Sequence, residues 1–455
     1  MKVKVKVETT TILKPTYEPT SPPSTHVLPL TVFDKVTYDT HIAVIYAFRP
    51  PTPPNATIKL GLQKTLAGYR EFAGRLGRDE NGNPKLILLN DEGVKLVEAS
   101  TDARLDEVMP LTPSPAAWSL HPALKDVEEL VQVQLTRFGC GSLVVGFTSH
   151  HLVADGRSTS KFLVAWGRAT RGLDVGPLPY RERAIFAPRE PPVVEHDHRG
   201  AEYETRCRDE NLKLGVSSFQ SDYLVDGIVF HKVHFTLDFL SKLKSRCCTG
   251  SSSTSRCSTF VSVAAHLWRT ITRARNLGGS DSTRFRISVD GRTRMMVNDS
   301  RVPDEYFGNL VLWAFPTSRV EDLLNEPLSY AAQLINDAVA RVNDGYFKSF
   351  VDFASHVDVE EEGLVPTADA EKSVLSPDLE VHSWLRYPFY DVDFGGGCRP
   401  CVFMPSFFPA EGVMFMLPSF VGDGSVDAFV PLLRDNLDAF EKSATCWINN
   451  REVNY

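Results

Sequence analysis

Two adjacent histidines followed by an aspartate form the part of the chain best suited to chemistry. His150 and His151 end an apolar stretch, Asp155 comes four residues after the second histidine, and Gly156 closes the turn. An imidazole exchanges protons near neutral pH, because its ordinary pKa is about 6.5. The spacing therefore predicts a general base at the end of a rigid element, facing a cleft.

The elements on either side of this motif should hold it in place. Leu143–Phe147 is apolar and rich in β-branched residues, which predicts a buried strand. Ser158–Arg168 carries its large apolar residues on one side, which predicts a helix. Two simpler interpretations compete, because a lone histidine is often a packed residue and Asp155 before a helix is often an N-cap. The doubled histidine and the strand before it favour the catalytic interpretation.

The composition limits the classes of protein that fit. The 455 residues carry a formal net charge of −8, which argues against a nucleic-acid or anionic-membrane partner. No apolar run is long enough to cross a membrane, and the first residues lack the apolar core of a secretory signal. The eight cysteines form no dense framework, so a reducing, cytoplasmic location is expected. The CxxC at Cys398–Cys401 lacks the further ligands of a zinc site, so no metal is predicted.

The length predicts more than one hydrophobic core. Prolines and charged residues gather from Gly176 to Gly200, and the main crossover between domains is placed there. The predicted units are an N-terminal domain at 1–190, a linker at 191–215 and a C-terminal domain at 216–455, with a segment near 385–410 packing on the N-terminal domain. Other predicted elements are the helices Thr57–Tyr69, Thr259–Arg275 and Val426–Phe440 and the strand Phe285–Val289.

Two separated motifs resemble those of a known enzyme family. His151 and Asp155 lie in HHLVADG, and Asp393 begins DFGGG much further along the chain. This ordered pair resembles the HxxxD and DFGWG motifs of the plant BAHD acyltransferases, and the likeness covers nearly the whole chain. The supporting segments are YREFAGRLG, STFVSVAAHLWRTITRAR, VDGRTRM and EYFGN. Gly396 departs from the family pattern, because a tryptophan usually stands at that position.

The resemblance implies an α/β, two-domain chloramphenicol-acetyltransferase-like fold. Each domain is expected to be a mixed β-sheet with flanking helices, and an active-site channel is expected between the domains. Acyl-CoA would enter the channel from one face and the acceptor from the other. Acyl-CoA is therefore expected as a co-substrate, and no permanently bound cofactor is expected.

The resemblance also implies roles for individual residues. His151 would be the general base for attack on a CoA thioester, without a covalent acyl-enzyme, since the chain has no GxSxG elbow. Asp155 would point away from the substrate and pair with Arg292 or Arg294. The indole N–H of Trp384 would stabilise the oxyanion, although a plain core tryptophan is an alternative. The predicted structural motif residues are Asp155, Gly156, Arg292, Asp393, Phe394, Gly395 and Gly397.

Substrate-binding residues are less sharply defined by the sequence. The chain has no phosphate-binding glycine loop, so CoA contacts are predicted at scattered residues, namely Arg256, Ser258, Thr259 and Arg294. An aliphatic amine is cationic at neutral pH, so its site should hold a carboxylate. The predicted acceptor-binding residues are His382, Asp352, Asp358 and Glu380. Each of the acidic candidates also has an ordinary interpretation as a solvated side chain.

Within the family, the chain is most similar to the grass agmatine coumaroyltransferase group. TVFDK, IYAFRPP, SWLRYPFYDVDFGGG and LPSFVGDGSVDAFVPL carry this likeness. It implies a coumaroyl- or feruloyl-CoA donor and a primary amine acceptor, which is agmatine, putrescine, tryptamine, serotonin or tyramine. A histidine at 382, where an acid would suit a guanidinium, weakens the case for agmatine.

Three alternatives to this function remain at the level of sequence. A BAHD O-acyltransferase would use an alcohol such as shikimate, and a condensation domain of peptide synthesis shares the HHxxxDG pattern. A catalytically inactive relative would act only as a binding protein, although the intact His151 and Asp155 argue against that interpretation. The resemblance implies a monomer whose partners are its small-molecule substrates.

Overall fold

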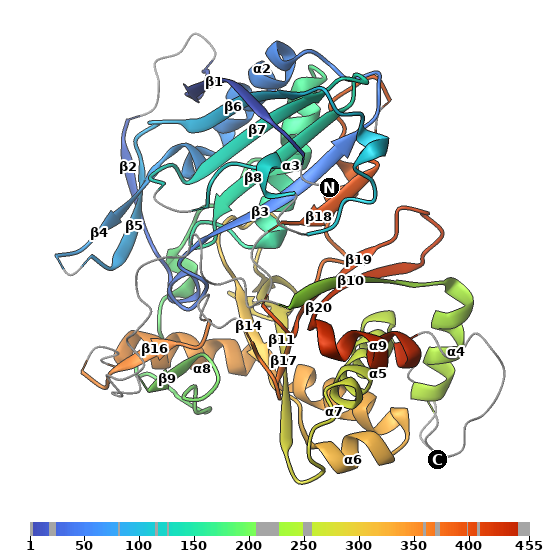
Figure 1. Cartoon of the computed structure of the whole chain (residues 1–455). Helices are drawn as coiled ribbons and strands as arrows, with labels where there is room; N and C mark the ends of the chain where they lie inside the picture. The colour runs from blue at the N-terminus through green and yellow to red at the C-terminus, as the bar shows by residue number, and fades with distance from the viewer. Residues whose placement is uncertain are drawn as a thin grey trace.

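The computed structural model divides into two halves, each built on a mixed β-sheet (Figure 1). The structure describes all residues except 1–2, 18–23, 81, 114–116, 125–126, 206–226, 249–256, 358–360, 369–373, 398, 407–409 and 445–455. Three residues singled out above, Arg256, Asp358 and Cys398, lie outside the described residues. Within the described part of the chain, no helix is long and apolar enough to span a membrane.

The first sheet contains the strand that leads into the histidine motif. In spatial order its strands are β1 (Lys6–Leu13), β6 (Val94–Thr101), β7 (Val131–Phe138), β8 (Leu143–His150), β3 (His41–Phe48) and β18 (Val402–Pro405). Strands β6 and β7 are parallel, and the other pairs are antiparallel. The two helices α2 (Asn55–Gly68) and α3 (Gly156–Thr170) pack against each other beside this sheet (Figure 1). A smaller sheet contains β2 (His26–Pro29), β5 (Pro84–Leu89) and β4 (Arg75–Arg78).

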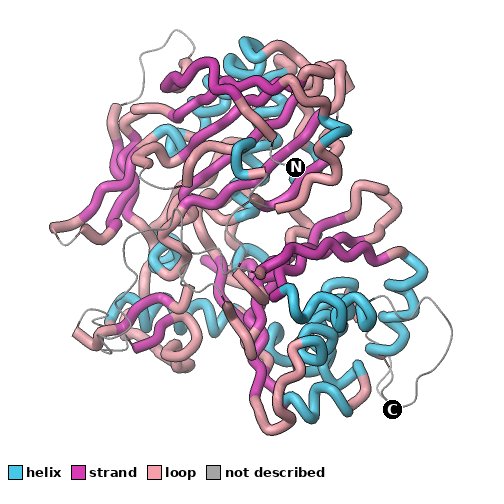
Figure 2. Tube along the Cα trace, in the orientation of Figure 1, coloured by secondary structure: helices cyan, strands magenta, loops and turns pink. Residues whose placement is uncertain are grey.

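The second sheet carries the helical part of the molecule. In spatial order its strands are β10 (Ile228–Phe235), β20 (Val426–Leu433), β19 (Val413–Pro418), β17 (Leu379–Ser383), β11 (Ser282–Asp290) and β14 (Val311–Ala314), and β15 (Thr317–Arg319) also pairs with β11. Figure 2 shows helices gathered beside this sheet. These helices are α4 (Leu237–Cys247), α5 (Thr259–Ala274), α6 (Val320–Asn325), α7 (Leu328–Arg341) and α9 (Arg434–Ala444). The remaining elements are α1 (Val32–Lys35), α8 (Asp344–His356) and the strand pairs β9 (Tyr203–Thr205) with β16 (Leu364–Pro366) and β12 (Met296–Val297) with β13 (Ser300–Arg301).

The long helix α5 illustrates how local sequence sets an element. The Ser258 side chain accepts a hydrogen bond from the Val261 N–H at 3.2 Å and so caps the helix. Its apolar residues recur at helical spacing, and Trp268 is fully buried in the core of the second half. The capping serine and the apolar face therefore fix both the start of α5 and the side that packs on the sheet.

The two hydrophobic cores are interlocked rather than separate. Phe33 and Val36, from the start of the chain, are buried in the core of the second half. In return, Phe307, Phe415 and Phe429 are buried in the core that belongs to the first sheet. Each half therefore depends on residues contributed by the other.

Local sequence patterns predicted most of these elements, with one clear error. The helix predicted at Thr57–Tyr69 is α2, and the helix predicted at Thr259–Arg275 is α5. The helix predicted from Val426 to Phe440 is wrong over its first part, because Val426–Leu433 is strand β20. This strand lies between β10 and β19 and is buried along nearly its whole length. A strand covered on both faces has the continuous apolar pattern that a buried helix also shows.

Candidate active site

A cavity of about 200 Å³ lies where the two halves meet. Its walls come from β3 and the turn after β8 in the first half, and from β11, β14, β17 and β19 in the second. Six of the residues singled out in the sequence line it: His151, Asp155, Gly156, Glu380, His382 and Trp384. A mostly apolar hollow with a few polar groups is the form that small-molecule sites take.

His151, the first residue after β8, is held through its backbone and its ring. Its backbone N–H donates to the carbonyl of Thr40 at 2.9 Å, and its carbonyl accepts from Nδ2 of Asn309 at 2.9 Å. On the ring, Nδ1 lies 3.0 Å from Oγ1 of Thr37. Burial, and next the neighbouring His382, lower the pKa of His151 to about 4. The imidazole is therefore neutral at pH 7 and able to accept a proton.

The first histidine of the pair does not line the cavity. Nε2 of His150 lies 3.4 Å from a carboxylate oxygen of Asp39, and Nδ1 accepts from the Leu152 N–H at 3.4 Å. Its ring also meets the ring of His41 edge-on, at 4.8 Å between centroids. These contacts place His150 as a support for the turn that carries His151.

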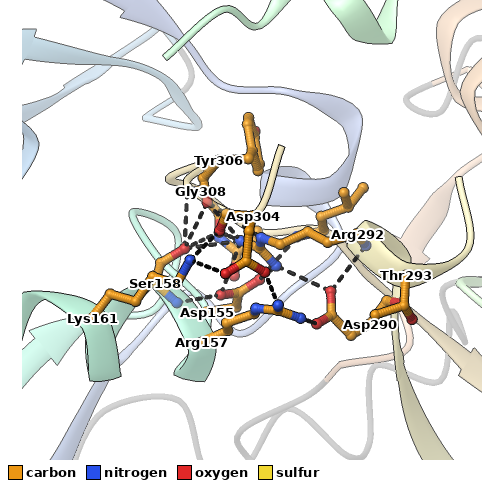
Figure 3. A network of polar contacts seen from close by, with 12 residues as sticks. Asp155, Arg157, Ser158, Lys161, Asp290, Arg292, Thr293, Asp304, Tyr306 and Gly308 are labelled. Atoms are coloured by element: carbon orange, nitrogen blue, oxygen red, sulfur yellow. Dashed lines mark hydrogen bonds and ion pairs between the residues drawn. The ribbon is translucent and has the colours of Figure 1, made fainter. Parts of the chain in front are cut away.

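The Asp155 carboxylate bridges the two halves by pairing with Arg292 (Figure 3). One carboxylate oxygen accepts from the Ser158 N–H at 2.9 Å and so caps α3, and the other accepts from Arg292 Nη1 at 2.7 Å. Arg292 is the partner rather than Arg294. Its guanidinium also donates to the carbonyls of Tyr306 and Gly308. Asp155 is therefore a buried link between the start of α3 and the second half.

A second set of charges surrounds this link (Figure 3). Asp290 accepts from Arg157 Nη1 at 2.5 Å and from Arg292 Nη1 at 3.2 Å. Arg157 and Lys161 on α3 also contact Asp304 in the second half. Alternating charges of this kind hold the N-terminal end of α3 against the β11 end of the second half.

Trp384 stands next to the turn that follows the histidine motif. Its ring packs among Phe389, Phe403 and Phe415, with centroids 5.0–5.7 Å apart. A side chain added at Gly156 would lie 3.5 Å from the indole nitrogen. Among the described residues, the indole N–H has no hydrogen-bond partner, so it is free to donate to a bound group.

Glu380 places a buried negative charge on the opposite wall. Its carboxylate accepts from the Tyr38 hydroxyl at 2.6 Å and lies 2.9 Å from Nε2 of His382. Arg286 lies 3.5 Å from it and stacks on the Trp313 ring at 3.7 Å. Burial raises the pKa of Glu380, but Arg286, His382 and Tyr38 outweigh it and hold the pKa at about 2. The carboxylate therefore stays ionised at neutral pH.

The DFGGG segment packs against α3 rather than against the cavity. Asp393 accepts from Arg171 Nη1 at 2.9 Å and from the Gly395 N–H at 2.8 Å. Its backbone approaches Gly167 of α3 so closely that an added side chain there would meet Asp393 O at 2.8 Å. Phe394 is buried against Trp166, at 4.8 Å between centroids. Gly395, Gly396 and Gly397 all have positive φ, a backbone conformation that favours glycine.

Comparisons with known proteins identify the family. Residues 4–446 match the family model described as the Transferase family. The chain belongs to this family, the BAHD acyltransferases. It is 52% identical over 449 residues to agmatine hydroxycinnamoyltransferase 1 of Oryza sativa subsp. japonica, covering 96% of this chain and 98% of that protein. It is 50% identical to a putrescine hydroxycinnamoyltransferase of the same organism, covering 97% and 99%.

Solved structures agree with the fold. The structure of vinorine synthase matches with a TM-score of 0.70 and 19% identity, over 96% of both chains. F. graminearum TRI101, complexed with coenzyme A and deoxynivalenol, matches with a TM-score of 0.70 and 19% identity, over 91% of this chain and 96% of that one. At these identities the likeness concerns the fold alone, and it confirms the predicted two-domain α/β architecture.

Not every residue singled out in the sequence of this BAHD acyltransferase lies at the cavity. The Asp352 carboxylate is bound by Arg189, through the backbone N–H and Nε at 2.7 Å each. Ser258, Thr259 and Arg294 also do not line the cavity. Among the described residues, no group of three or more His, Cys, Asp or Glu is arranged to hold a metal ion.

Several residues around the cavity belong to no motif that the sequence shows. Thr37 and Tyr38 lie in the segment between α1 and β3 and contact His151 and Glu380 respectively. Asn309 ends the EYFGN segment, which supports the family resemblance but does not by itself predict the contact of this amide with the His151 carbonyl. No spacing rule connects these positions, because they meet only through the tertiary fold.

Proposed function

We propose that the chain transfers a hydroxycinnamoyl group from its CoA thioester to a primary amine, giving an amide and free CoA. The observation that carries this proposal is one cavity that holds a neutral imidazole, an indole N–H and a buried carboxylate. Relatives named agmatine and putrescine hydroxycinnamoyltransferases, each about half identical to the chain, support both the donor and the acceptor class.

His151 is the proposed general base. The amine nitrogen attacks the thioester carbonyl, and Nε2 of His151, the ring nitrogen away from Thr37, accepts the proton that the nitrogen loses. The carbonyl oxygen becomes negative, and the Trp384 N–H donates to it. Collapse of the tetrahedral species breaks the carbon–sulfur bond, and the proton on His151 passes to the leaving thiolate. No covalent acyl-enzyme is needed.

Glu380 is the proposed contact for the positive charge of the acceptor. Of the described residues that line the cavity, the acidic ones are Asp155 and Glu380, and Asp155 is already paired with Arg292. The Arg286 guanidinium lies beside Glu380 and offsets part of its negative charge. The site therefore suits the ammonium group of an amine rather than another guanidinium beside that of Arg286. A diamine fits this arrangement, since one end can bind near Glu380 while the neutral end reacts. We therefore favour putrescine-like amines over agmatine.

Release of CoA thiol from coumaroyl-CoA tests the proposal. Purified protein is offered agmatine, putrescine, tryptamine, tyramine and shikimate in turn, and His151→Ala is measured beside the wild type. We expect turnover with amines and a loss of about 100- to 10,000-fold in kcat in the variant. His26→Ala is the matched control, because His26 is exposed and far along the chain from the motif.

Other outcomes would redirect the proposal. Turnover with shikimate alone would place the enzyme among O-acyltransferases, and silence from folded protein would reject the hydroxycinnamoyl donor. Unchanged activity in His151→Ala would reject the imidazole as base. A cytoplasmic monomer is also proposed, and gel filtration of the purified chain tests its oligomeric state.

A further inference from the structure

Among the described residues, the side chain within hydrogen-bond distance of the His151 ring is a threonine, not a carboxylate. Many catalytic histidines have their orientation fixed by an acidic side chain. Here the Asp155 carboxylate already binds Arg292 and the Ser158 N–H at the start of α3. Nδ1 of the His151 ring instead lies 3.0 Å from Oγ1 of Thr37. Thr37 also lines the cavity. Its hydroxyl is therefore the side-chain group placed to influence which ring nitrogen carries the proton.

The direction of this hydrogen bond follows from the part that His151 takes in the reaction. A general base accepts its proton on an unprotonated nitrogen, and Nε2 is the ring nitrogen that faces away from Thr37. A neutral imidazole carries one hydrogen, which then lies on Nδ1. The Thr37 hydroxyl oxygen, 3.0 Å from Nδ1, is placed to accept from this N–H.

We propose that Thr37 is a positioning residue, whose hydroxyl keeps His151 in the Nδ1–H form with Nε2 free to take the proton of the acceptor. This proposal rests on the acyl transfer proposed above, and the tautomer that it requires can be measured without turnover. Without the hydroxyl, the ring can rotate or exchange its proton between the two nitrogens. Either change takes the base out of its reactive state.

The segment that carries Thr37 is well held on both sides. Before it, the carboxylate of Asp34 accepts from the N–H of Thr31, the N-cap of the short helix α1, at 2.8 Å. It also accepts from the backbone and side chain of Asn309 at 3.0 Å each. After it, Tyr38 donates to Glu380 at 2.6 Å, and the Thr40 carbonyl accepts from the His151 N–H. The hydroxyl is thus fixed relative to His151 by bonds from both halves of the molecule.

Two substitutions separate this role from simple packing. Thr37→Val keeps the shape of the side chain and removes the hydroxyl, whereas Thr37→Ser keeps the hydroxyl and removes the methyl group. We expect kcat to fall about 10- to 100-fold in Thr37→Val with little change in either KM, because only the proton-transfer step is weakened. Thr37→Ser should stay within about threefold of the wild type.

Nitrogen-15 NMR of histidine-labelled protein gives a readout that does not depend on turnover. The two tautomers differ in their long-range proton–nitrogen correlations, and His151→Ala identifies the signal of His151. We expect the Nδ1–H form in the wild type and in Thr37→Ser, and a shift toward Nε2–H in Thr37→Val. An Nε2–H signal in the wild type would overturn the proposal, even if no substrate of the panel were turned over.

The kinetic measurements on the Thr37 variants can also overturn the proposal. A Thr37→Val enzyme with kcat close to that of the wild type would show that the hydroxyl does not matter for the reaction. Equal losses in Thr37→Val and Thr37→Ser would assign the effect to packing of the methyl group. If Thr37→Val fails to fold, the wild-type tautomer together with the activity of Thr37→Ser still decides the question.

Discussion

The pairing of Asp155 with Arg292 predicts that Asp155→Ala damages stability before it damages chemistry. The side chains are 3% and 1% exposed, and they approach to 2.7 Å across the boundary between the two halves. Removing one partner of a buried pair costs about 3–5 kcal/mol, because the other charge stays buried without it. Arg292 keeps Asp290 at 3.2 Å, which favours the lower end of that range.

The same substitution also removes the cap of α3, which adds about 1 kcal/mol. The expected total is about 4 kcal/mol, a large part of the 5–15 kcal/mol that stabilises an ordinary domain. Urea denaturation followed by tryptophan fluorescence measures the loss, and Asp155→Asn should lose less because its amide oxygen can still cap the helix. The urea midpoint of the wild type provides the reference.

Asp106→Ala is the matched control for this experiment. Asp106 also pairs with an arginine at 2.7 Å, but both side chains of that pair are more than half exposed to solvent. Its removal should leave the urea midpoint unchanged, since exposed pairs are screened by water. The reasoning is refuted if both variants keep the wild-type midpoint while Asp155→Ala loses as much kcat as His151→Ala. That result would give the Asp155 carboxylate a direct part in the reaction.

Three further predictions concern the cavity and the buried histidines. Glu380→Gln should raise the KM for a diamine at least tenfold with little effect on the KM for coumaroyl-CoA, and equal KM changes would contradict the proposed ammonium contact. Trp384→Phe keeps the ring but removes the N–H, so kcat should fall about 100-fold; an unchanged kcat would assign the residue to packing. The pKa values of His41, His151 and His266 are lowered to about 4, chiefly by burial. Because their unfolded pKa is about 6.5, the unfolded chain binds more protons between these values, and stability should fall as the pH falls from 6.5 to 4. Urea midpoints at pH 7 and pH 5 measure this fall, and a higher midpoint at pH 5 would contradict it.

Local sequence was sufficient for the turn that carries His151. A buried strand, a polar turn and a capped helix are each encoded within about ten residues, so β8, the histidines and α3 could be predicted together. The strand β20 could not, because its run of apolar residues is compatible with either a helix or a central strand. Its place between β10 and β19 is decided by distant parts of the chain.

The choice among charged residues depended on the tertiary fold in the same way. Glu380 and Asp352 are both acidic residues in apolar surroundings, yet Glu380 lines the cavity and Asp352 is bound to Arg189. Arg292 and Arg294 are equally close to Asp155 in sequence, and the short 3₁₀ turn at Gly291–Thr293 buries only Arg292. The partner of each charged residue depends on which side chains meet across the two halves. A local sequence pattern does not contain that information.

The interlocked sheets also have a consequence for synthesis of the protein on the ribosome. Strand β3 ends at Phe48, but its neighbour β18 begins only at Val402, roughly 350 residues later. At about 5–20 residues per second, the edge of the first sheet stays unpaired for about 20–70 seconds while the rest of the chain is made. The unpaired N–H and C=O groups of this strand edge can pair with those of other nascent chains. The edge formed by β3 is therefore the part of the nascent chain most exposed to wrong pairing until β18 emerges.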